Sequence, residues 1–132
     1  MASLIHLDTH AVIWLAAGEV LRFSPFVPPL LQQASPVISP IVLLELDYLH
    51  EVGKLKVPGR DIVNDLAGKI GLTLDAGSFT AIVQAAADLT WTRDPFDRLI
   101  AATARAAGAP LLTKDATILA HESSAFWDQP PL

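Results

Sequence analysis

The sequence predicts a single α/β domain over residues 1–132, an α/β/α sandwich with a short, mainly parallel central sheet of about four to five strands. Three observations support this prediction. Short apolar runs alternate with longer segments of helical periodicity. Pro, Gly, Asp and Ser residues stand where these helices would begin or end. With 52% hydrophobic and 17% charged residues, a chain of 132 residues can bury one core without disulfides or structural metals.

The elements are predicted from local hydrophobic patterns and from the residues that begin and end helices. The apolar run LIHL at residues 4–7 predicts a buried strand that ends at Asp8, and a helix follows over residues 9–17. Three prolines between residues 25 and 29 stand before a second helix, expected at 30–34. The other expected elements, in order, are a strand at 37–38, a helix from Pro40 to Gly53, a helix at 60–70, a strand at 72–74, a helix at 78–89, a helix from Asp94 to Gly108, a strand at 111–112, a helix at 115–120 and an edge strand at 125–127.

Composition excludes several classes of protein. The chain has no cysteine, which removes disulfides, thiolate zinc sites and cysteine nucleophiles, and which fits a cytoplasmic protein. The opening MASLIHLDTH lacks the basic region of a signal peptide, and no apolar run is long enough to span a membrane. With 9 basic and 14 acidic residues the net charge is −5, which argues against non-specific coating of nucleic acid.

Two acidic residues follow predicted strands. Asp8 comes directly after LIHL, and Asp115 comes after the apolar pair of PLLTK. In parallel α/β sheets ligands bind beyond the carboxyl ends of the strands, so both side chains are candidate site residues. Aspartate is also a preferred N-cap, and both residues precede a helical segment. Both interpretations stay open for each residue.

The segment DPFD presents the same ambiguity. Asp94 is explained as the N-cap of a helix that has Pro95 in its first turn. Asp97 then lies in that first turn, where an acidic side chain favours the helix dipole. Its carboxylate is free to point toward a site above the sheet.

Glu45 is the most informative acidic residue. On a helical wheel, the apolar stripe of the helix that begins at Pro40 is centred on Ile41, Leu49 and Val52, with Tyr48 and Val42 beside them. Glu45 lies in its middle. The same wheel places Asp47, His50 and Glu51 on the solvated side. A buried carboxylate must be paired, protonated or bound to a cation. An ion pair with an arginine and a metal site are the two interpretations.

Together the four acidic residues predict a metal-dependent activity. Asp8, Glu45, Asp97 and Asp115 are all expected at one rim of the sheet. Carboxylates within a few ångströms of one another repel, and a proton or a metal ion relieves the repulsion. Ligands that are all oxygen favour Mg²⁺ or Mn²⁺ over zinc. Such a site suits phosphodiester hydrolysis.

Four motifs, in order along nearly the whole chain, resemble the PIN-domain family and in particular VapC-type toxins. They are LDTHAVIWL, SPIVLLEL, RDPFDRLIAATA and LLTKD, with a tryptophan near the C-terminus. The resemblance places the family's four acidic residues at Asp8, Glu45, Asp97 and Asp115. It implies a magnesium-dependent endoribonuclease that forms homodimers and is inhibited by a small antitoxin.

The same resemblance suggests supporting residues. Thr9, Thr113 and Asp94 are expected beside the metal site or as alternative ligands.

Arg93, Arg98 and Lys114 adjoin the proposed acids and are the expected RNA phosphate contacts, although an ordinary solvated role explains them equally well. Arg98 shares a helix face with Arg105, which favours solvent or an ion pair. A zinc site at His10 lacks enough nitrogen or sulfur ligands nearby.

Three alternatives are weighed against the ribonuclease. A haloacid dehalogenase-like phosphatase would use Asp8 as its nucleophile, but it carries a second aspartate where this chain has His10. A phospho-receiver domain wants adjacent acids after the first strand, and this chain lacks them. A non-catalytic PIN-like scaffold would have no reason to retain four destabilising acids.

Overall fold

The computed structural model describes residues 3–131 and has one central sheet of five parallel strands in the order β3-β2-β1-β4-β5. This confirms the predicted α/β fold. The five strands are β1 (Leu4–Leu7), β2 (Ser35–Ile38), β3 (Thr73–Leu74), β4 (Leu111–Leu112) and β5 (Ala125–Phe126). The helical segments are α1 (Thr9–Ala16), η1 (Val20–Arg22), α2 (Val27–Gln33), α3 (Pro40–Glu51), α4 (Gly59–Ile70), α5 (Phe79–Ala87), α6 (Pro95–Ala107) and α7 (Ala116–His121).

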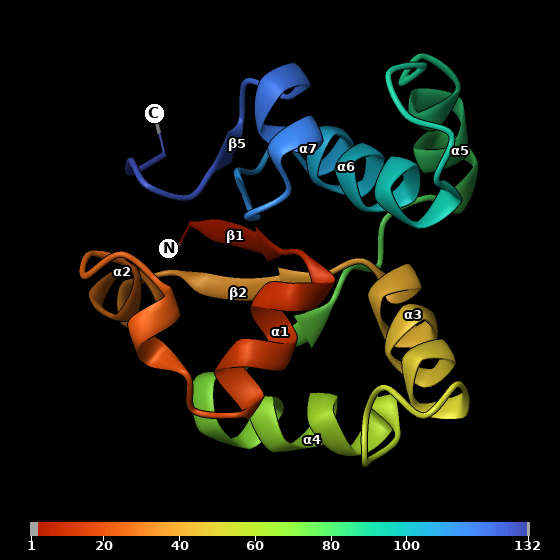
Figure 1. The fold of residues 1–132 in the computed structure, drawn as a ribbon. Helices are drawn as coiled ribbons and strands as arrows, with labels where there is room; N and C mark the ends of the chain where they lie inside the picture. The colour runs from red at the N-terminus through yellow and green to blue at the C-terminus, as the bar shows by residue number, and fades with distance from the viewer. Residues whose placement is uncertain (1–2, 132) are drawn as a thin grey trace.

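Helices cover the sheet on both faces. Figure 1 shows α5, α6 and α7 gathered on one side of the strands and α1 and α4 on the other, with α2 and α3 at the two ends. The core between the layers is built from fully buried aliphatic side chains of both strands and helices. Among them are Leu7, Ile38, Leu46, Leu66, Ile100, Leu111, Leu112 and Ile118. Burying one such side chain contributes about 1.5–3 kcal/mol.

The region before β2 differs from the sequence prediction. Helix α2 begins at Val27, before its two prolines, and a short 3-10 helix at Val20–Arg22 was not predicted. The prolines fit inside the first turn of α2 because the amide groups of that turn have no partner within the helix. Strand β2 is also longer than expected, because Ser35 and Pro36 pair with β1.

No helix in residues 3–131 is both long enough and apolar enough to cross a bilayer. The helices end with ordinary caps, and Gly71 and Gly108 take the left-handed conformation after α4 and α6. Glycine is the residue that adopts this conformation at least cost.

Candidate functional site

The order of the strands in the sheet identifies one position where a ligand can bind. Strands β2 and β3 lie on one side of β1, whereas β4 and β5 lie on the other. The strand order therefore reverses between β1 and β4, and ligands of open α/β sheets bind beyond the carboxyl ends of the strands at such a point. Asp8 follows β1 and Thr113 follows β4.

The backbone amide and the carboxylate of Asp8 make three hydrogen bonds at this point. Its backbone amide donates to the carbonyl of Leu112 (3.0 Å), and its Oδ1 accepts from the amide of Thr9 (2.6 Å) at the start of α1. Its Oδ2 accepts from the hydroxyl of Thr113 (2.5 Å). The side chain therefore caps the helix, as one interpretation held, and still faces the end of the sheet. Burial raises the pKa of Asp8, against the lowering effect of the Thr113 and Thr9 hydrogen bonds.

Glu45 is half-buried and reaches the same region from α3. Its Oε1 accepts from the hydroxyl of Thr9 (2.5 Å), which links it to the residue that Asp8 caps. Burial raises the pKa of Glu45, and the nearby charges of Asp8 and Asp94 raise it further. No ion pair of residues 3–131 includes Glu45, so the arginine interpretation is not supported.

The helical wheel for α3 was partly wrong. The buried residues of α3 are Val42 and Leu46, whereas Tyr48 and Val52 are half exposed. Helix α3 packs against both α4 and α6, so its buried face is centred on Val42 and Leu46 and overlaps the predicted stripe only in part. Glu45 lies at the edge of the buried face, where its carboxylate can reach the sheet end.

Two residues near the predicted solvated side of α3 hold the connection from α3 to α4. Asp47 accepts from the amide of Gly59 (2.7 Å), and the Nδ1 of His50 lies 3.0 Å from the carbonyl of Leu55. A helical wheel cannot predict these contacts, because they depend on the path of the chain after the helix.

Asp94 and Asp97 stand at the start of α6. Asp94 is the N-cap, and its Oδ1 accepts from the amides of Phe96 (2.9 Å) and Asp97 (3.3 Å). The carboxylate of Asp97 accepts no hydrogen bond from residues 3–131. Burial raises the pKa of Asp97 to about 7, helped by the charges of Asp94, Asp8, Asp115 and Glu45. The charges of four neighbouring carboxylates thus act on Asp97 in the same direction as its burial.

Asp115 joins the group through Thr113. The Asp115 side chain caps α7 by accepting from the amide of Ile118 (2.9 Å), and its own amide donates to the hydroxyl of Thr113 (3.0 Å). That hydroxyl in turn donates to Asp8. Thr113 is fully buried and therefore fixes the spacing of two acids across the β1–β4 boundary.

All four predicted acids line one cavity of about 490 Å³. Its walls are formed by Asp8, His10, Trp14, Glu45, Asp94, Asp97, Lys114 and Asp115. Five carboxylates therefore face a single lysine. Their oxygens are the donors that Mg²⁺ and Mn²⁺ prefer, and their mutual repulsion favours a bound cation, so the donor set fits a divalent ion.

The present spacing of the acids does not form a coordination sphere. Within the described part of the chain, no three Asp, Glu or His side chains lie close enough together to share one metal ion. The four acids were expected to lie within a few ångströms of one another. The structure places them in one cavity, but no three of them lie close enough together to share one ion. Glu45 and Asp97 project into the cavity from different helices, α3 and α6.

The basic residues predicted to contact RNA divide into two groups. Lys114 lines the cavity. The Arg98 guanidinium instead donates to the carbonyls of Ala86 (2.9 Å) and Ala87 (3.4 Å) at the end of α5, and Arg93 donates to the carbonyl of Thr90 (3.0 Å). The structure does not bring these two arginines to the cavity wall.

Two cavity residues are not among those that the sequence selects. By sequence alone, Trp14 is interpreted as a filler of the core or an interface, and His10 lacks the neighbours of a zinc ligand. Both lie on α1, four residues apart and therefore on one helix face, with ring centroids 5.7 Å from each other. That spacing, directly after Asp8, is the signal that could have found them.

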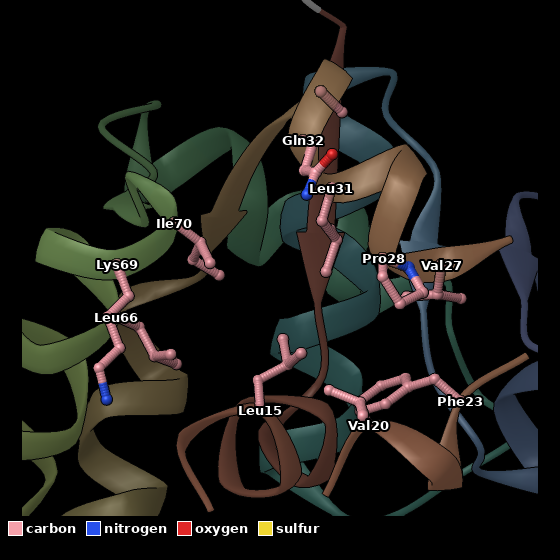
Figure 2. A pocket seen from close by; sticks show the side chains of 11 residues that line it. Leu15, Val20, Phe23, Val27, Pro28, Leu31, Gln32, Leu66, Lys69 and Ile70 are labelled. Carbon is pink, nitrogen blue, oxygen red and sulfur yellow. The ribbon is translucent and has the colours of Figure 1, made fainter. Parts of the chain in front are cut away.

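A second cavity of about 490 Å³ has the opposite character. Figure 2 shows its lining converging from α1, η1, α2 and α4, with Leu15, Leu31, Leu66 and Ile70 around the space. Only Gln32 and Lys69 bring polar side-chain groups to it, and Lys69 forms an ion pair with Asp65 (3.1 Å). We refer to this cavity as the apolar groove.

Comparisons with known proteins agree with this architecture. A family model described as PIN domain matches residues 5–121. The chain is similar to the crystal structure of VapBC2 from Rickettsia felis bound to a DNA fragment from their promoter, with a TM-score of 0.68 and 20% identity over 95% of this chain and 99% of that one. A toxin–antitoxin complex from Klebsiella pneumoniae matches with a TM-score of 0.58 and 18% identity over 95% and 96% of the two chains.

A third structure, a domain of a functionally unknown protein from Methanocaldococcus jannaschii, matches with a TM-score of 0.62 and 21% identity over 99% of this chain and 94% of that one. The comparison with curated proteins finds no match. At identities near 20% these likenesses concern the fold, and they confirm the α/β architecture that the motifs predicted.

Proposed function

Because this chain belongs to the PIN domain family, we propose that it is a metal-dependent endoribonuclease that hydrolyses RNA phosphodiester bonds with Mg²⁺ or Mn²⁺. The observation that carries the proposal is the cavity at the β1–β4 boundary, which is lined by five carboxylates and a single lysine. Asp8, Glu45, Asp97 and Asp115 are the proposed ligands and catalytic residues. Asp94 is an alternative ligand.

The residues around the acids have a positioning role in this proposal. When bound, a divalent ion supplies positive charge that makes water a better nucleophile and stabilises the leaving oxygen. The hydroxyl of Thr113 orients Asp8, and the hydroxyl of Thr9 orients Glu45. Such partners of ligand carboxylates typically affect metal affinity or activity by about 10- to 100-fold.

Asp97 couples the site to protons. With a pKa of about 7, a large part of this carboxyl group is protonated at neutral pH when no cation is present. A divalent ion competes with that proton, because metal ligands must be deprotonated. Activity is therefore expected to rise with pH as Asp97 loses its proton.

We also propose that the chain is the toxin of a toxin–antitoxin pair. Two of the similar structures are described as VapBC2 bound to promoter DNA and as a toxin–antitoxin complex, which supports a protein partner for this chain. The apolar groove offers an antitoxin segment an apolar surface away from the acids. A homodimer is proposed as well, with the exposed apolar side chains of Leu44, Tyr48, Phe79 and Val83 on α3 and α5 as its contact surface.

The test of the nuclease proposal is cleavage of a single-stranded RNA by the purified chain. We expect cleavage in Mg²⁺ or Mn²⁺ and none in excess chelator. An Asp8→Asn protein purified in parallel controls for contaminating ribonuclease. Cleavage that is insensitive to the chelator, or no cleavage in either ion, would contradict the proposal. Hydrolysis of a small phosphomonoester without RNA cleavage would instead support the phosphatase alternative.

A further inference from the structure

Two cationic side chains near the acidic cavity lie over the ring of one tryptophan. The Nζ of Lys114 lies 5.8 Å from the ring centroid of Trp14 and 6.0 Å from that of Trp127. On the same Trp14 indole, the guanidinium of Arg22 lies 5.0 Å from the ring centroid. Of this cluster, Trp14 and Lys114 line the same cavity as the carboxylates.

Trp14 is held in place from behind. Its ring centroid lies 5.7 Å from that of Trp127 and 6.2 Å from that of Phe23, both with edge-to-face geometry, and Trp127 and Phe23 are buried. Such aromatic pairs stabilise one orientation of the ring. His10 packs one turn earlier on α1, on the solvent side. The half-buried indole of Trp14 is therefore a preoriented apolar surface at the rim of a charged cavity.

Lys114 has no competing partner among the described residues. Arg22 is paired with Glu19 at 2.5 Å, whereas no carboxylate of residues 3–131 lies within ion-pair distance of Lys114, although five line the same cavity. Its ammonium group is exposed and remains available to an anion. Without a bound cation the acids repel an RNA strand, whereas Lys114 attracts its phosphates.

We propose that Trp14 and Lys114 form a nucleotide-binding subsite beside the acidic cavity. The indole of Trp14 stacks on a base next to the scissile phosphodiester, in place of the Arg22 guanidinium that lies over the same ring in the free chain. Lys114 contacts the phosphate that leads into the cavity. Stacking on an aromatic side chain contributes to single-strand binding without strict sequence preference, because every base has a π face. This inference rests on the proposed ribonuclease function and assigns the side from which RNA enters.

The test measures RNA binding in an Asp97→Asn background, which removes cleavage from the readout. A fluorescent, unstructured RNA of mixed sequence is the first probe, and an abasic oligomer of the same length is the second. Trp14→Leu keeps apolar volume against Phe23 and Trp127 but removes the flat ring. Trp91→Leu is the matched control, because Trp91 is half-buried, stacks on His121 and does not line the cavity.

We expect Trp14→Leu to weaken RNA binding on the order of 10-fold and to leave binding of the abasic oligomer unchanged. Trp14→Phe should restore most of the lost affinity, because it restores an aromatic face. Trp91→Leu should have no effect on either probe. An equal loss on both probes, or an equal loss for Trp14→Leu and Trp91→Leu, would overturn the stacking role and assign Trp14 to packing alone.

Lys114 is tested by its charge. Lys114→Gln should weaken binding of both probes and lower the dependence of log Kd on log salt by about 0.7, the value for one phosphate contact on a single strand. Lys56→Gln is the control, because Lys56 is exposed between α3 and α4. An unchanged salt dependence in Lys114→Gln would remove the phosphate contact.

Wild-type cleavage separates failure of the subsite from failure of the nuclease function. If the wild-type chain cuts RNA in Mg²⁺ but Trp14→Leu and Lys114→Gln bind RNA normally, the subsite is wrong and the nuclease proposal stands. If the wild-type chain neither binds nor cuts RNA, the proposed function fails first. Weaker binding of a protein partner by Trp14→Leu, with normal RNA binding, would overturn the subsite in favour of a partner contact.

Discussion

The acidic cavity and the apolar groove have the same volume of about 490 Å³ and share one helix, yet their chemistry is opposite. Helix α1 contributes Trp14 to the cavity and the next residue, Leu15, to the groove. The cavity holds five carboxylates, and the groove is lined mainly by aliphatic side chains. One fold thus offers a surface for a cation and a surface for an apolar segment.

The two hollows differ in what they require of a ligand. An open apolar groove exposes apolar surface to water. A partner that covers it would gain about 25 cal/mol of free energy for each square ångström buried. The acidic cavity has a cost that depends on pH, because its carboxyl groups lose solvation and repel one another. The raised pKa values of Asp8, Glu45 and Asp97 have the direction that this cost implies. The cavity therefore favours a proton or a cation even without a substrate.

The largest expected effect separates the two regions by activity. Asp8→Asn or Asp97→Asn should fold normally and lower divalent-dependent RNA cleavage by at least about 100-fold, since each removes a proposed ligand oxygen. Circular dichroism checks the fold, and cleavage of a labelled RNA measures the rate. Undiminished cleavage by either variant would remove that residue from the catalytic set.

A smaller effect is expected in the groove. Val20 lines it and is 51% exposed, so Val20→Glu should leave the fold and RNA cleavage intact. The same change should weaken binding of the proposed antitoxin partner by about 10-fold, because it places a charge in an apolar contact. Titration calorimetry measures the affinity.

The neighbouring residue provides the control. Leu21 is 97% exposed and does not line the groove, so Leu21→Glu should bind the antitoxin as the wild type does. Equal weakening by the two substitutions would show that charge in general, rather than the groove, governs the interaction. The groove would then have no special role in binding the antitoxin.

The smallest effect concerns stability. The pKa of Glu45 is raised in the folded chain, so its ionised form is disfavoured by folding, and stability is lost as the pH rises above the unfolded pKa. Glu45→Gln should therefore raise the Tm in metal-free buffer at pH 8 and have little effect near pH 4. A gain of a few degrees is expected, since about 1 kcal/mol corresponds to roughly 4 °C in a domain of this size.

Saturating Mg²⁺ should reverse that order. The wild-type chain gains stability from ligand binding, whereas Glu45→Gln gains less because a ligand oxygen is replaced by an amide. Thermal denaturation at two pH values, with and without Mg²⁺, measures all four cases. A fall in Tm for Glu45→Gln in metal-free buffer at pH 8 would indicate that the ionised carboxylate stabilises the fold, through its hydrogen bond with Thr9 or an attraction to a cationic group.

Much of the fold was predictable because its signals are local. Apolar runs and helix caps stand next to one another in the chain, so β1, Asp8 and the N-caps at Asp94 and Asp115 follow from short segments. Where an aspartate could be either a helix cap or a site residue, the structure shows that it is a cap and is compatible with the second role. Asp8 caps α1 through one oxygen and faces Thr113 with the other.

Features that depend on packing between distant elements were not predictable in the same way. The helical wheel placed the buried face of α3 only partly correctly, because α4 and α6 decide which of its residues are buried. The role of Arg98 depends on where α5 ends, since its guanidinium binds the carbonyls there. The cluster of Lys114 with Trp14 joins residues that are far apart in the chain, and no local pattern announces it.

The central claim is that the acidic cavity binds a divalent cation, and the most direct measurement is anomalous diffraction from crystals soaked in Mn²⁺. We expect a peak between Asp8 and its neighbouring acids, with carboxylate oxygens about 2.1 Å from the ion, after side-chain rotation has drawn them together. A cavity without a peak at saturating Mn²⁺, or a peak held only by residues outside it, would contradict the claim.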